Sequence, residues 1–284
     1  VFFGHNESLP RKLHGKDISY NNLLDIEAAL RLIQDFTDPS IAILKHNNAC
    51  GCASSQDLEQ AWERALKADP ASAFGGIIVM NRPLSGVLAQ EMDKLFFEVI
   101  MAPSYDPGAL EILKSRKNRI ILAYDQQASL PEKEFRSLFD GVVVQDRDTL
   151  VEDPASFTQV TRKSPTKAQV ADLVFANKLV KHTKSNAIVL AANGMLLASG
   201  MGQTSRVDAL KHAIEKAREN NLSLKEAVMA SDAFFPFPDC VELAHKAGIT
   251  AVIQPGGSIK DQLSIDYCNT NNMAMVFTGI RHFK

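Results

Sequence analysis

The sequence has no long apolar run and no excess of basic residues. No apolar stretch approaches the roughly 20 residues that a membrane-spanning helix needs, and the start, Val1-Phe2-Phe3-Gly4-His5, lacks the basic segment and long apolar core of a secretory signal. The 31 Lys and Arg against 33 Asp and Glu leave a formal net charge of −2, which argues against a general nucleic-acid or membrane-binding surface. We therefore expect a cytoplasmic protein that binds small molecules or other protein subunits. The first residue is not Met, so we expect the natural N-terminus to be missing.

Cysteine is also scarce, with Cys50, Cys52, Cys240 and Cys268 only. Four cysteines are too few for a disulfide scaffold of 284 residues, so we expect reduced thiols. The spacing His46-x-x-x-Cys50-x-Cys52 suits zinc but lacks a recognisable fourth ligand. The zinc nucleobase-deaminase signature is incomplete, because the one His-x-Glu, at His5-Asn6-Glu7, is followed by no Pro-Cys-x-x-Cys. We expect no catalytic metal.

The composition, 45% hydrophobic and 23% charged, is that of a globular protein with one large domain or two compact ones. Strand-like and helix-like segments alternate, which predicts an α/β fold. The dipeptide Asn193-Gly194 predicts a hairpin between two further strands. Helices are expected over 21–36, 58–67, 86–97, 167–181, 206–220 and 240–246, and strands over 41–44, 77–80, 120–124, 249–254 and 274–277.

The two halves of the chain repeat an order of segments. In each half a Lys-His pair lies beside an apolar strand, and a helix and a segment rich in Asp and aromatic residues follow. Lys45-His46 follows the strand at 41–44, and Lys181-His182 precedes the apolar run 187–192. This order predicts a divergent duplication, with one subdomain over 1–125, a connecting subdomain over 126–165 and a second subdomain over 166–284.

Lys45 and His46 are the first candidates for chemistry, because ligands collect at the carboxyl ends of strands in α/β sheets. Adjacent residues of an extended chain point to opposite sides, so a pair that faces one ligand needs the irregular backbone of a loop. Such a pair could supply a positive charge and a general base. The alternative is a solvated surface pair. Lys181-His182 ends an amphipathic helix, where the macrodipole favours cations, so we assign no chemistry to it.

Several loops in the second half are candidates for binding. The amide of Asn186 could bind a carboxamide or amine through its donor and acceptor together, or form an Asx turn. The segment 200–206 leaves a strand and opens a helix, so its glycines and Arg206 are a candidate phosphate site. Phe234-Phe235-Pro236-Phe237 could form an apolar slot for a ring-shaped ligand, or pack on the core. The segment 255–258 is a candidate binding loop or an ordinary turn.

An ordered set of motifs gives the chain a family resemblance that runs from Leu13 to Lys284. It closely resembles the formyltransferase domain of the bifunctional purine-biosynthesis enzymes, in which AICAR transformylase is fused to IMP cyclohydrolase. The motifs are KHNN at 45–48, DPASAFGG at 69–76, SNAI at 185–188, GQTSRVD at 202–208, SDAFFPF at 231–237, IQPGGS at 253–258 and FTGIRHF at 277–283.

The resemblance implies two cytidine-deaminase-like α/β subdomains related by duplication, without zinc. It implies a homodimer whose active sites lie at the subunit interface. The reaction would transfer a formyl group from the co-substrate 10-formyltetrahydrofolate to the 5-amino group of AICAR ribonucleotide, giving FAICAR and tetrahydrofolate. A structural monovalent cation is compatible with the resemblance. The hydrolase activity of the cyclohydrolase would belong to a part of the enzyme that this chain lacks.

The resemblance also implies roles for single residues, matched motif by motif. His46 would accept the amine proton, while Lys45 and Asn186 would stabilise the oxyanion on the formyl carbon. The folate side would be lined by Pro236, Phe237, Asp239 and Ser258. The nucleotide would be bound by Asn22, Phe74, Gly75, Glu98, Gln203, Arg206, Phe234 and Arg281. Pro238 departs from the pattern, since many members of the family have arginine there.

Two other classes of function remain open on the sequence alone. A zinc-dependent or water-dependent nucleobase deaminase is the enzymatic alternative, and it would release ammonia. A non-catalytic fragment that binds nucleotide and dimerises is the other alternative, suggested by the missing N-terminus.

Overall fold

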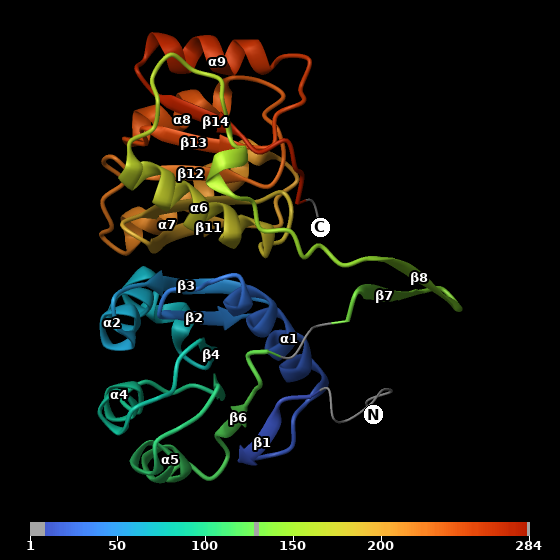
Figure 1. The fold of residues 1–284 in the computed structure, drawn as a ribbon, viewed down its shortest axis with the longest axis vertical. Helices are drawn as coiled ribbons and strands as arrows, with labels where there is room; N and C mark the ends of the chain where they lie inside the picture. The colour runs from blue at the N-terminus through green and yellow to red at the C-terminus, as the bar shows by residue number, and fades with distance from the viewer. Residues whose placement is uncertain (1–8, 128–130, 283–284) are drawn as a thin grey trace.

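The computed structural model describes residues 9–127 and 131–282 and shows a mixed α/β fold (Figure 1). Twelve strands form one mixed sheet in the order β1-β6-β5-β4-β2-β3-β11-β10-β12-β13-β14-β9, and β7 and β8 form a separate two-stranded sheet. In the first half, the strands are β1 (Arg11–His14), β2 (Ser40–Lys45), β3 (Asn48–Ser54), β4 (Ile77–Met80), β5 (Val99–Ala102) and β6 (Ile120–Ala123). In the second half, they are β9 (Thr158–Gln159), β10 (Ile188–Ala192), β11 (Met195–Gly200), β12 (Val228–Ser231), β13 (Ala251–Gln254) and β14 (Ala274–Phe277). The separate sheet consists of β7 (Lys133–Leu138) and β8 (Gly141–Asp146).

Helices cover both faces of the large sheet. One face packs against α1 (Tyr20–Gln34) and α6 (Lys167–Lys181), whose buried residues share a core with alternate strand residues such as Ala42 and Val189. The core on the opposite face of the sheet includes Ile41 and Ile188, which precede Ala42 and Val189 and therefore point to the other side of their strands. The helices on that face are α2 (Leu58–Ala68), α3 (Pro70–Ala73), α4 (Gly86–Met92), α5 (Pro107–Lys114), α7 (Arg206–Glu219), α8 (Asp239–Ala247) and α9 (Asp261–Thr270). Because both faces are covered, the inner strands are continuously apolar.

Most elements lie where the sequence predicts them. The α/β alternation and the hairpin at Asn193-Gly194 are confirmed, since β10 and β11 pair antiparallel across that dipeptide. The helix predicted over 86–97 is wrong beyond Met92, because α4 ends there with Asp93 as its C-cap residue. The chain then turns, buries Phe97 and enters β5, an element that was not predicted. Also unpredicted are β1, β3, β12, α5 and α9, whose short or glycine-containing segments have weak periodicity.

The two halves of the sheet have the same order and orientation of strands. A hairpin (β2–β3 or β10–β11) pairs antiparallel with a third strand (β4 or β12). Two parallel strands follow, and a short antiparallel strand forms the outer edge. The halves meet where β3 and β11 pair antiparallel at Ala53 and Met195.

The register brings distant segments to one end of the sheet, which we call the His46 end. Lys45 at the end of β2 pairs with Asn48, while Ile188 at the start of β10 pairs with both Gly200 and Ser231. The antiparallel pairing of β3 with β11 places both sets at the same end. β12, β13 and β14 run parallel and finish there, whereas β4, β5 and β6 start there.

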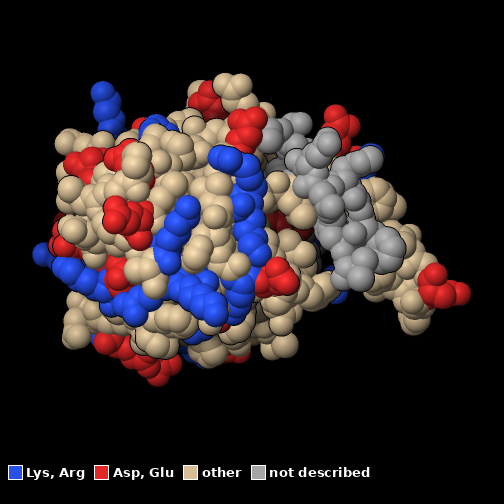
Figure 2. Space-filling model, turned by 90° about the horizontal axis from the view of Figure 1, so that it is seen from below, with Lys and Arg blue, Asp and Glu red and all other residues tan. Residues whose placement is uncertain are grey.

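The surface has mixed charge, and no described helix is long and apolar enough to cross a membrane. Figure 2 shows the face below the first half, where Lys and Arg lie among Asp and Glu. Ion pairs on the first half include Lys12 with Asp17 and Arg116 with Asp93, at 3.3 and 3.6 Å. This distribution agrees with the small net charge of the sequence.

Candidate functional site

Lys45 and His46 occupy the tight turn between β2 and β3. His46 and Asn47 both have left-handed backbone angles, with φ of 52° and 65°, as the two central residues of a hairpin turn require. Asp25 of α1 accepts a hydrogen bond from the Asn47 backbone N–H at 2.6 Å and so holds the turn against the helix. The predicted irregular backbone at this pair is therefore present.

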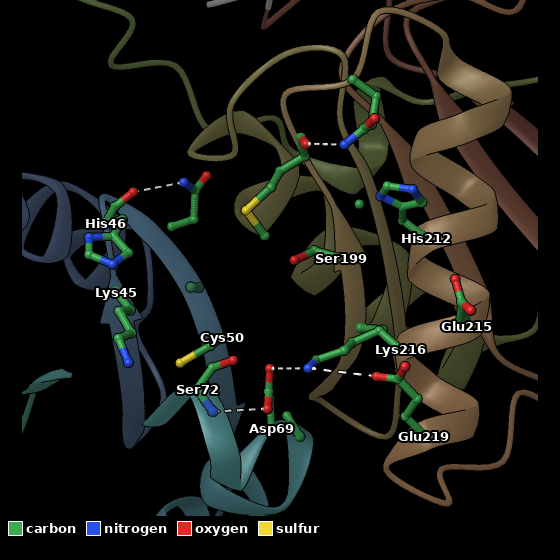
Figure 3. Close-up of a pocket in the computed structure, with 17 residues that line it drawn as sticks. Lys45, His46, Cys50, Asp69, Ser72, Ser199, His212, Glu215, Lys216 and Glu219 are labelled. Carbon is green, nitrogen blue, oxygen red and sulfur yellow. Dashed lines mark hydrogen bonds and ion pairs between the residues drawn. The ribbon is translucent and has the colours of Figure 1, made fainter. Parts of the chain in front are cut away.

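A pocket of about 430 Å³ opens beside this turn, between the two halves of the molecule (Figure 3). In Figure 3, Lys45, His46, Cys50, Asp69 and Ser72 approach from the first half, and residues of β11 and α7 face them. The full lining is Lys45, His46, Asn48, Ala49, Cys50, Ala68, Asp69, Ser72, Ala198, Ser199, Gly200, Met201, Gln203, His212, Glu215, Lys216 and Glu219.

An ion pair between two residues that line the pocket connects the two halves. Lys216 Nζ lies 3.0 Å from Asp69 Oδ2, and the Ser72 backbone N–H donates to Asp69 Oδ1 at 3.1 Å. Burial alone would raise the pKa of Asp69, but these hydrogen bonds and the Lys216 charge lower it overall. Burial, with the nearby Asp69 charge, raises the pKa of the Cys50 thiol to about 12. The thiol therefore stays protonated near neutral pH and is not a thiolate nucleophile there.

Lys45 reaches the segment that precedes β4. Its Nζ donates to the backbone carbonyl of Phe74 at 2.9 Å. The Phe74 ring is 58% exposed and contacts the Phe96 ring at a centroid distance of 5.2 Å. Gly75 has a φ of +73°, and its N–H donates to the Phe96 carbonyl at 2.8 Å. The structure thus brings together Lys45, Phe74 and Gly75, three of the predicted site residues.

Asn186 is held in a polar network at the start of β10. Its side-chain Nδ2 donates to the Gln203 carbonyl at 2.9 Å, and its Oδ1 accepts from Arg206 Nη2 at 3.1 Å. Arg206 also donates to Ser231 Oγ at 2.9 Å and to Asp232 Oδ1 at 2.8 Å. The amide orientation of Asn186 is therefore fixed by a donor on one side and an acceptor on the other.

Asp232 anchors this network from a fully buried position. Its Oδ1 also accepts the Ala187 backbone N–H at 3.1 Å, while its Oδ2 is buried and has no hydrogen-bond partner among residues 9–127 and 131–282. The side chain of Arg206 is only 10% exposed. That Arg206 binds phosphate stays a prediction, because the described contacts direct it to Asp232, Ser231 and Asn186.

The aromatic loops after β12 and β13 also lie at the His46 end. Arg281 lies over the Phe234 ring at 5.9 Å, and Lys260 lies over the Phe237 ring at 4.3 Å. Phe237 is 49% exposed, whereas Phe235 is fully buried. The segment 234–237 therefore combines both predicted alternatives, core packing and an exposed ring. Near it, Pro236 is exposed on the same segment, and Ser258 donates its backbone N–H to Asp261 at 2.9 Å.

Three predicted site residues have structural partners of their own. Asn22 forms a capping box with Ser19 at the start of α1. Glu98, which precedes β5, pairs with Lys16 at 3.0 Å. Asp239 begins α8, where its Oδ1 accepts the Cys240 backbone N–H at 2.9 Å. Their assignment to substrate stays a prediction.

The predicted catalytic residues share an end of the sheet but are not in one cluster. His46 follows β2 and Asn186 precedes β10, and three strand intervals separate these strands, roughly 14 Å at the usual spacing. Lys45, His46 and Gln203 line the 430 Å³ pocket, while Asn186 lies outside its lining. The segment before Asn186 nevertheless lies beside the turn, since the Lys184 backbone N–H donates to Asn48 Oδ1 at 3.2 Å and Lys184 lines a pocket together with His46.

Lys181 and His182 lie at the end of α6, as the sequence predicted, and both contact the end of α1. Lys181 is 2% exposed, and its Nζ lies 3.1 Å from Asp35 Oδ2 at the end of α1. His182 Nε2 lies 2.7 Å from the same oxygen. The pair therefore joins the two halves through the partly buried carboxylate of Asp35, because α1 and α6 end side by side. Absence of catalytic chemistry there stays a prediction.

The sequence analysis missed a buried carboxylate clamp around His282. Its Nδ1 lies 2.6 Å from Asp148 Oδ2, and its Nε2 lies 2.8 Å from Glu152 Oε1. Burial alone would lower the pKa of His282, but the two carboxylates raise it to about 9. The only signal in the sequence was the acidic composition of the connecting segment, which does not indicate that its carboxylates contact His282. Asp69, Lys216 and Asp232 were missed as contacts for the same reason.

The cysteines and the possible metal ligands can be located within the described residues. All four cysteines are free, which confirms the expected reduced thiols. In residues 9–127 and 131–282, no group of three or more His, Cys, Asp and Glu is placed to hold a metal ion. His5 and Glu7 of the incomplete deaminase signature lie outside the described residues.

Comparison with known proteins gives a consistent family assignment. The family model described as AICARFT/IMPCHase bienzyme matches residues 4–216. A bifunctional purine biosynthesis protein PurH from Bacteroides thetaiotaomicron is 60% identical over 283 residues, which are 100% of this chain and 56% of that protein. Proteins of the same description from Lactobacillus delbrueckii subsp. bulgaricus and Aquifex aeolicus are 49% and 48% identical over 96% of this chain and 53% of their own lengths. The chain thus spans about half the length of these relatives.

A solved structure gives no further support. A diaminohydroxyphosphoribosylaminopyrimidine deaminase/5-amino-6-(5-phosphoribosylamino)uracil reductase from Thermotoga maritima matches 37% of this chain and 34% of its own, with 19% identity and a TM-score of 0.26. That similarity is too low to support an argument about fold or function.

Proposed function

Because the chain belongs to the AICARFT/IMPCHase bienzyme family, we propose that it catalyses the formyl transfer of purine biosynthesis. A formyl group passes from 10-formyltetrahydrofolate to the 5-amino group of AICAR ribonucleotide, giving FAICAR and tetrahydrofolate. The observation that supports this most directly is the pair Lys45 and His46 on the turn of the β2–β3 hairpin, at the mouth of a pocket. No residue of this chain is assigned to cyclohydrolase activity.

His46 acts as the general base in this proposal. The AICAR amine is a poor nucleophile, because its lone pair is delocalised into the imidazole and carboxamide. His46 removes an amine proton as the nitrogen attacks the formyl carbon, and histidine suits this task near neutral pH. The bond from the formyl carbon to N10 of the folate then breaks, and N10 takes a proton. Positioning by the remaining site residues lowers the barrier further.

Lys45 and Asn186 stabilise the oxyanion that develops on the formyl carbon. The contact of Lys45 with the Phe74 carbonyl holds its ammonium beside the turn. The network of Asn186 with Gln203 and Arg206 keeps one side-chain amide in a single orientation, which is what a preorganised donor requires. Neither group must reorganise at the moment of reaction.

The remaining predicted residues form two subsites in this proposal. Pro236, Phe237, Asp239 and Ser258 line the folate side, where the 49% exposed Phe237 ring offers a stacking surface. The exposed Phe74 ring and the Arg281 guanidinium over Phe234 suit a planar, anionic nucleotide. The nucleotide side consists of Asn22, Phe74, Gly75, Glu98, Gln203, Arg206, Phe234 and Arg281.

The active enzyme is a homodimer with its sites at the interface. The support is the separation of His46 from Asn186 by three strand intervals within one chain. In the homodimer, Asn186 of one copy would lie beside His46 of the other copy, so that each site combines residues of both copies. Such isologous sharing would produce two equivalent sites per dimer.

The fold proposal is a pair of cytidine-deaminase-like subdomains related by duplication, over 1–125 and 166–284, with a connecting subdomain over 126–165. Its support is the equal order of strands in the two halves and the matched helices α1 and α6. The capping boxes of Ser19 with Asn22 and Thr166 with Gln169 begin these helices. Asp25 and Asp172, the sixth residue of each helix, then hold the hairpin turn of their own half.

A structural monovalent cation fits one feature of the chain. The buried Asp232 Oδ2 has no hydrogen-bond partner in the part of the chain that the structure describes, and a buried carboxylate oxygen is normally satisfied. Asp232 would hold the cation, whose charge would offset the buried carboxylate beside Arg206. The catalytic steps above use no metal. We also propose a cytoplasmic enzyme without nucleic-acid or membrane partners, in keeping with the small net charge.

The test is an absorbance assay for tetrahydrofolate formation from 10-formyltetrahydrofolate and AICAR ribonucleotide. Formation of tetrahydrofolate together with FAICAR supports the proposal. A parallel assay for ammonia detects deaminase activity. Nucleotide binding without either product would identify a non-catalytic fragment and overturn the proposed reaction.

A further inference from the structure

The last described residues of the chain are attached to the connecting segment that follows β8 (Figure 1). His282 is 3% exposed and lies between two carboxylates, with Nδ1 2.6 Å from Asp148 Oδ2 and Nε2 2.8 Å from Glu152 Oε1. Both ring nitrogens therefore face an acceptor, and the charged imidazole can donate to both at once. We call these three residues the His282 clamp.

The carboxylates of the clamp are themselves held in place. Glu152 is buried and also interacts with the buried side chain of Asn177 on α6. Asp148 directly follows Arg147, which pairs with Glu27 of α1 at 3.3 Å. The clamp therefore attaches the C-terminal segment to both α1 and α6 through the connecting segment.

A second set of contacts fixes the same C-terminal segment just before the clamp. The Thr278 backbone N–H donates to the Gln254 carbonyl at 3.0 Å, at the end of β13. Thr278 Oγ1 donates to the Ile280 carbonyl at 2.9 Å and accepts the Ile280 N–H at 3.2 Å. Arg281 is the one residue between Ile280 and His282, so its backbone is restrained on both sides.

Arg281 and His282 have opposite environments although they are neighbours. Arg281 is exposed, and its guanidinium lies over the Phe234 ring at 5.9 Å, whereas His282 is buried. This pattern is typical of a segment in which neighbouring side chains point to opposite sides. Anchoring the His282 ring inside the protein therefore directs the Arg281 side chain outward, toward the loop that follows β12.

We propose that His282 is a positioning residue for the nucleotide, which it serves by holding the chain so that the Arg281 guanidinium stays over Phe234. This inference rests on the proposed function, in which Arg281 and Phe234 belong to the nucleotide side. His282 itself touches no substrate and transfers no proton. Its effect is to reduce the conformational freedom that Arg281 loses when an anionic nucleotide binds.

The clamp makes this positioning depend on pH. Burial alone would lower the pKa of His282, but Asp148 and Glu152 raise it to about 9. The other charged group nearby is Lys181 of α6, which lies near Asp148 and pairs with Asp35 at 3.1 Å. Below about pH 9 the charged ring donates to both carboxylates, and above it the neutral ring has a single N–H. Nucleotide affinity should therefore fall as the pH rises through about 9.

The first test is a double-mutant cycle, with the dissociation constant of AICAR ribonucleotide measured by calorimetry at about pH 7. Arg281→Gln removes a charged contact, and we expect affinity to fall by about 10- to 100-fold. His282→Gln should weaken binding by about three- to tenfold, the usual effect of ordering one long side chain. The double variant should match Arg281→Gln within about twofold, because His282 acts only through Arg281.

Turnover separates positioning from a general loss of structure. Because His282 does not contact the reacting atoms, the kcat of His282→Gln should stay within about threefold of the wild type. The control is His245→Gln, whose Nδ1 lies 3.3 Å from the Tyr267 hydroxyl and which should keep both affinity and kcat. Wild-type affinity in His282→Gln, additive losses in the double variant, or a fall in kcat with unchanged affinity would each overturn the inference.

The second test follows nucleotide affinity against pH and compares the wild type with Glu152→Gln. This substitution keeps an oxygen acceptor for Nε2 but removes one negative charge, so the pKa of His282 should fall. We expect near wild-type affinity at about pH 6 and a loss of affinity that begins about one pH unit lower than in the wild type. In Arg281→Gln the affinity should vary little over this interval. An unshifted midpoint in Glu152→Gln would show that another group controls the pH dependence, and this comparison decides the question if His282→Gln does not fold.

Calorimetry also separates this inference from the proposed function. If the wild type binds AICAR ribonucleotide but forms no tetrahydrofolate, the proposed reaction fails, and the mutant cycle still decides whether His282 positions Arg281. If formyl transfer proceeds and His282→Gln binds the nucleotide like the wild type, the role of His282 alone is refuted. A wild-type chain that binds no AICAR ribonucleotide would overturn both.

Discussion

The two halves of the sheet share one plan but present opposite ends to the proposed site. The second half presents the carboxyl ends of its parallel strands β12, β13 and β14 at the His46 end. The first half presents the starts of β4, β5 and β6 there, and the carboxyl end of β2. Binding loops at carboxyl ends are therefore concentrated in the second half, and the first half provides a hairpin turn.

The two halves also hold their polar residues differently. Lys45 and His46 lie on a turn, where the Lys45 side chain contacts the Phe74 carbonyl. Asn186 lies within a buried network of Arg206 and Asp232. We infer that the first half presents an accessible base and the second half a rigid donor. The rigid network of the second half depends on the buried charge of Asp232. Removing that charge should therefore lower the free energy of unfolding more than removing a polar contact of the first half.

The largest expected effect comes from His46→Ala in the first half. If His46 is the general base, turnover should fall by about 10²- to 10⁴-fold with little change in nucleotide affinity. Tetrahydrofolate formation and calorimetric binding of AICAR ribonucleotide measure the two quantities. The control is His245→Ala in the second half, whose ring contacts Tyr267. Turnover of His46→Ala near that of the wild type would refute the assignment.

The next effect concerns stability and compares Asp232 with Asp25. Asp232→Ala leaves the Arg206 guanidinium without its buried carboxylate, which should lower the free energy of unfolding by about 3–5 kcal/mol. Asp25→Ala removes the hydrogen bond to the first hairpin turn and should cost about 1 kcal/mol. Urea unfolding of both variants measures the difference. Equal losses would show that the two halves are held alike.

Glycines of β3 and β11 should be intolerant of a side chain in both halves. A Cβ at Gly200 of β11 would lie 1.7 Å from the Ala209 carbonyl oxygen, and one at Gly51 of β3 would lie 2.2 Å from that of Ala65. Each helix must move away, so Gly→Ala should destabilise by about 1–3 kcal/mol, more at Gly200. Gly108→Ala, which meets nothing within 4 Å, is the control for thermal unfolding. A tolerated Gly200→Ala would mean that α7 packs less closely on β11.

The smallest effect is the pH dependence of the clamp around His282. The pKa of His282 is raised from 6.5 to about 9, so its stabilisation is complete below pH 6.5 and is lost as the pH rises through about 9. The pKa values of Asp148 and Glu152 are lowered, so their part is lost at acidic pH. The Tm of the wild type should fall between about pH 7 and 10.

His282→Gln is the matched variant for this pH series. It cannot be protonated, so its Tm should depend less on pH over the same interval, while remaining below that of the wild type at about pH 6.5. Parallel curves for the two proteins would show that another group controls the alkaline loss of stability.

The sequence predicted the elements that have strong local signals. The 15-residue helix α6 has its predicted bounds, because Thr166 caps its start and its apolar stripe has helical spacing. The hairpin at Asn193-Gly194 follows from two residues that tolerate positive φ. The strand β3 was missed, because its sequence NACGCAS lacks the β-branched residues that mark strands. Its partners β2 and β11 impose the extended conformation.

By itself, the sequence determined the α/β class, the family and the residue types available for chemistry, because motifs and periodicities are local along the chain. Only the tertiary structure decided that Lys181 is buried against Asp35 and that Arg206 is held by Asp232. It also decided that His46 and Asn186 lie at one end of the sheet, since strand order and register set which distant segments become neighbours.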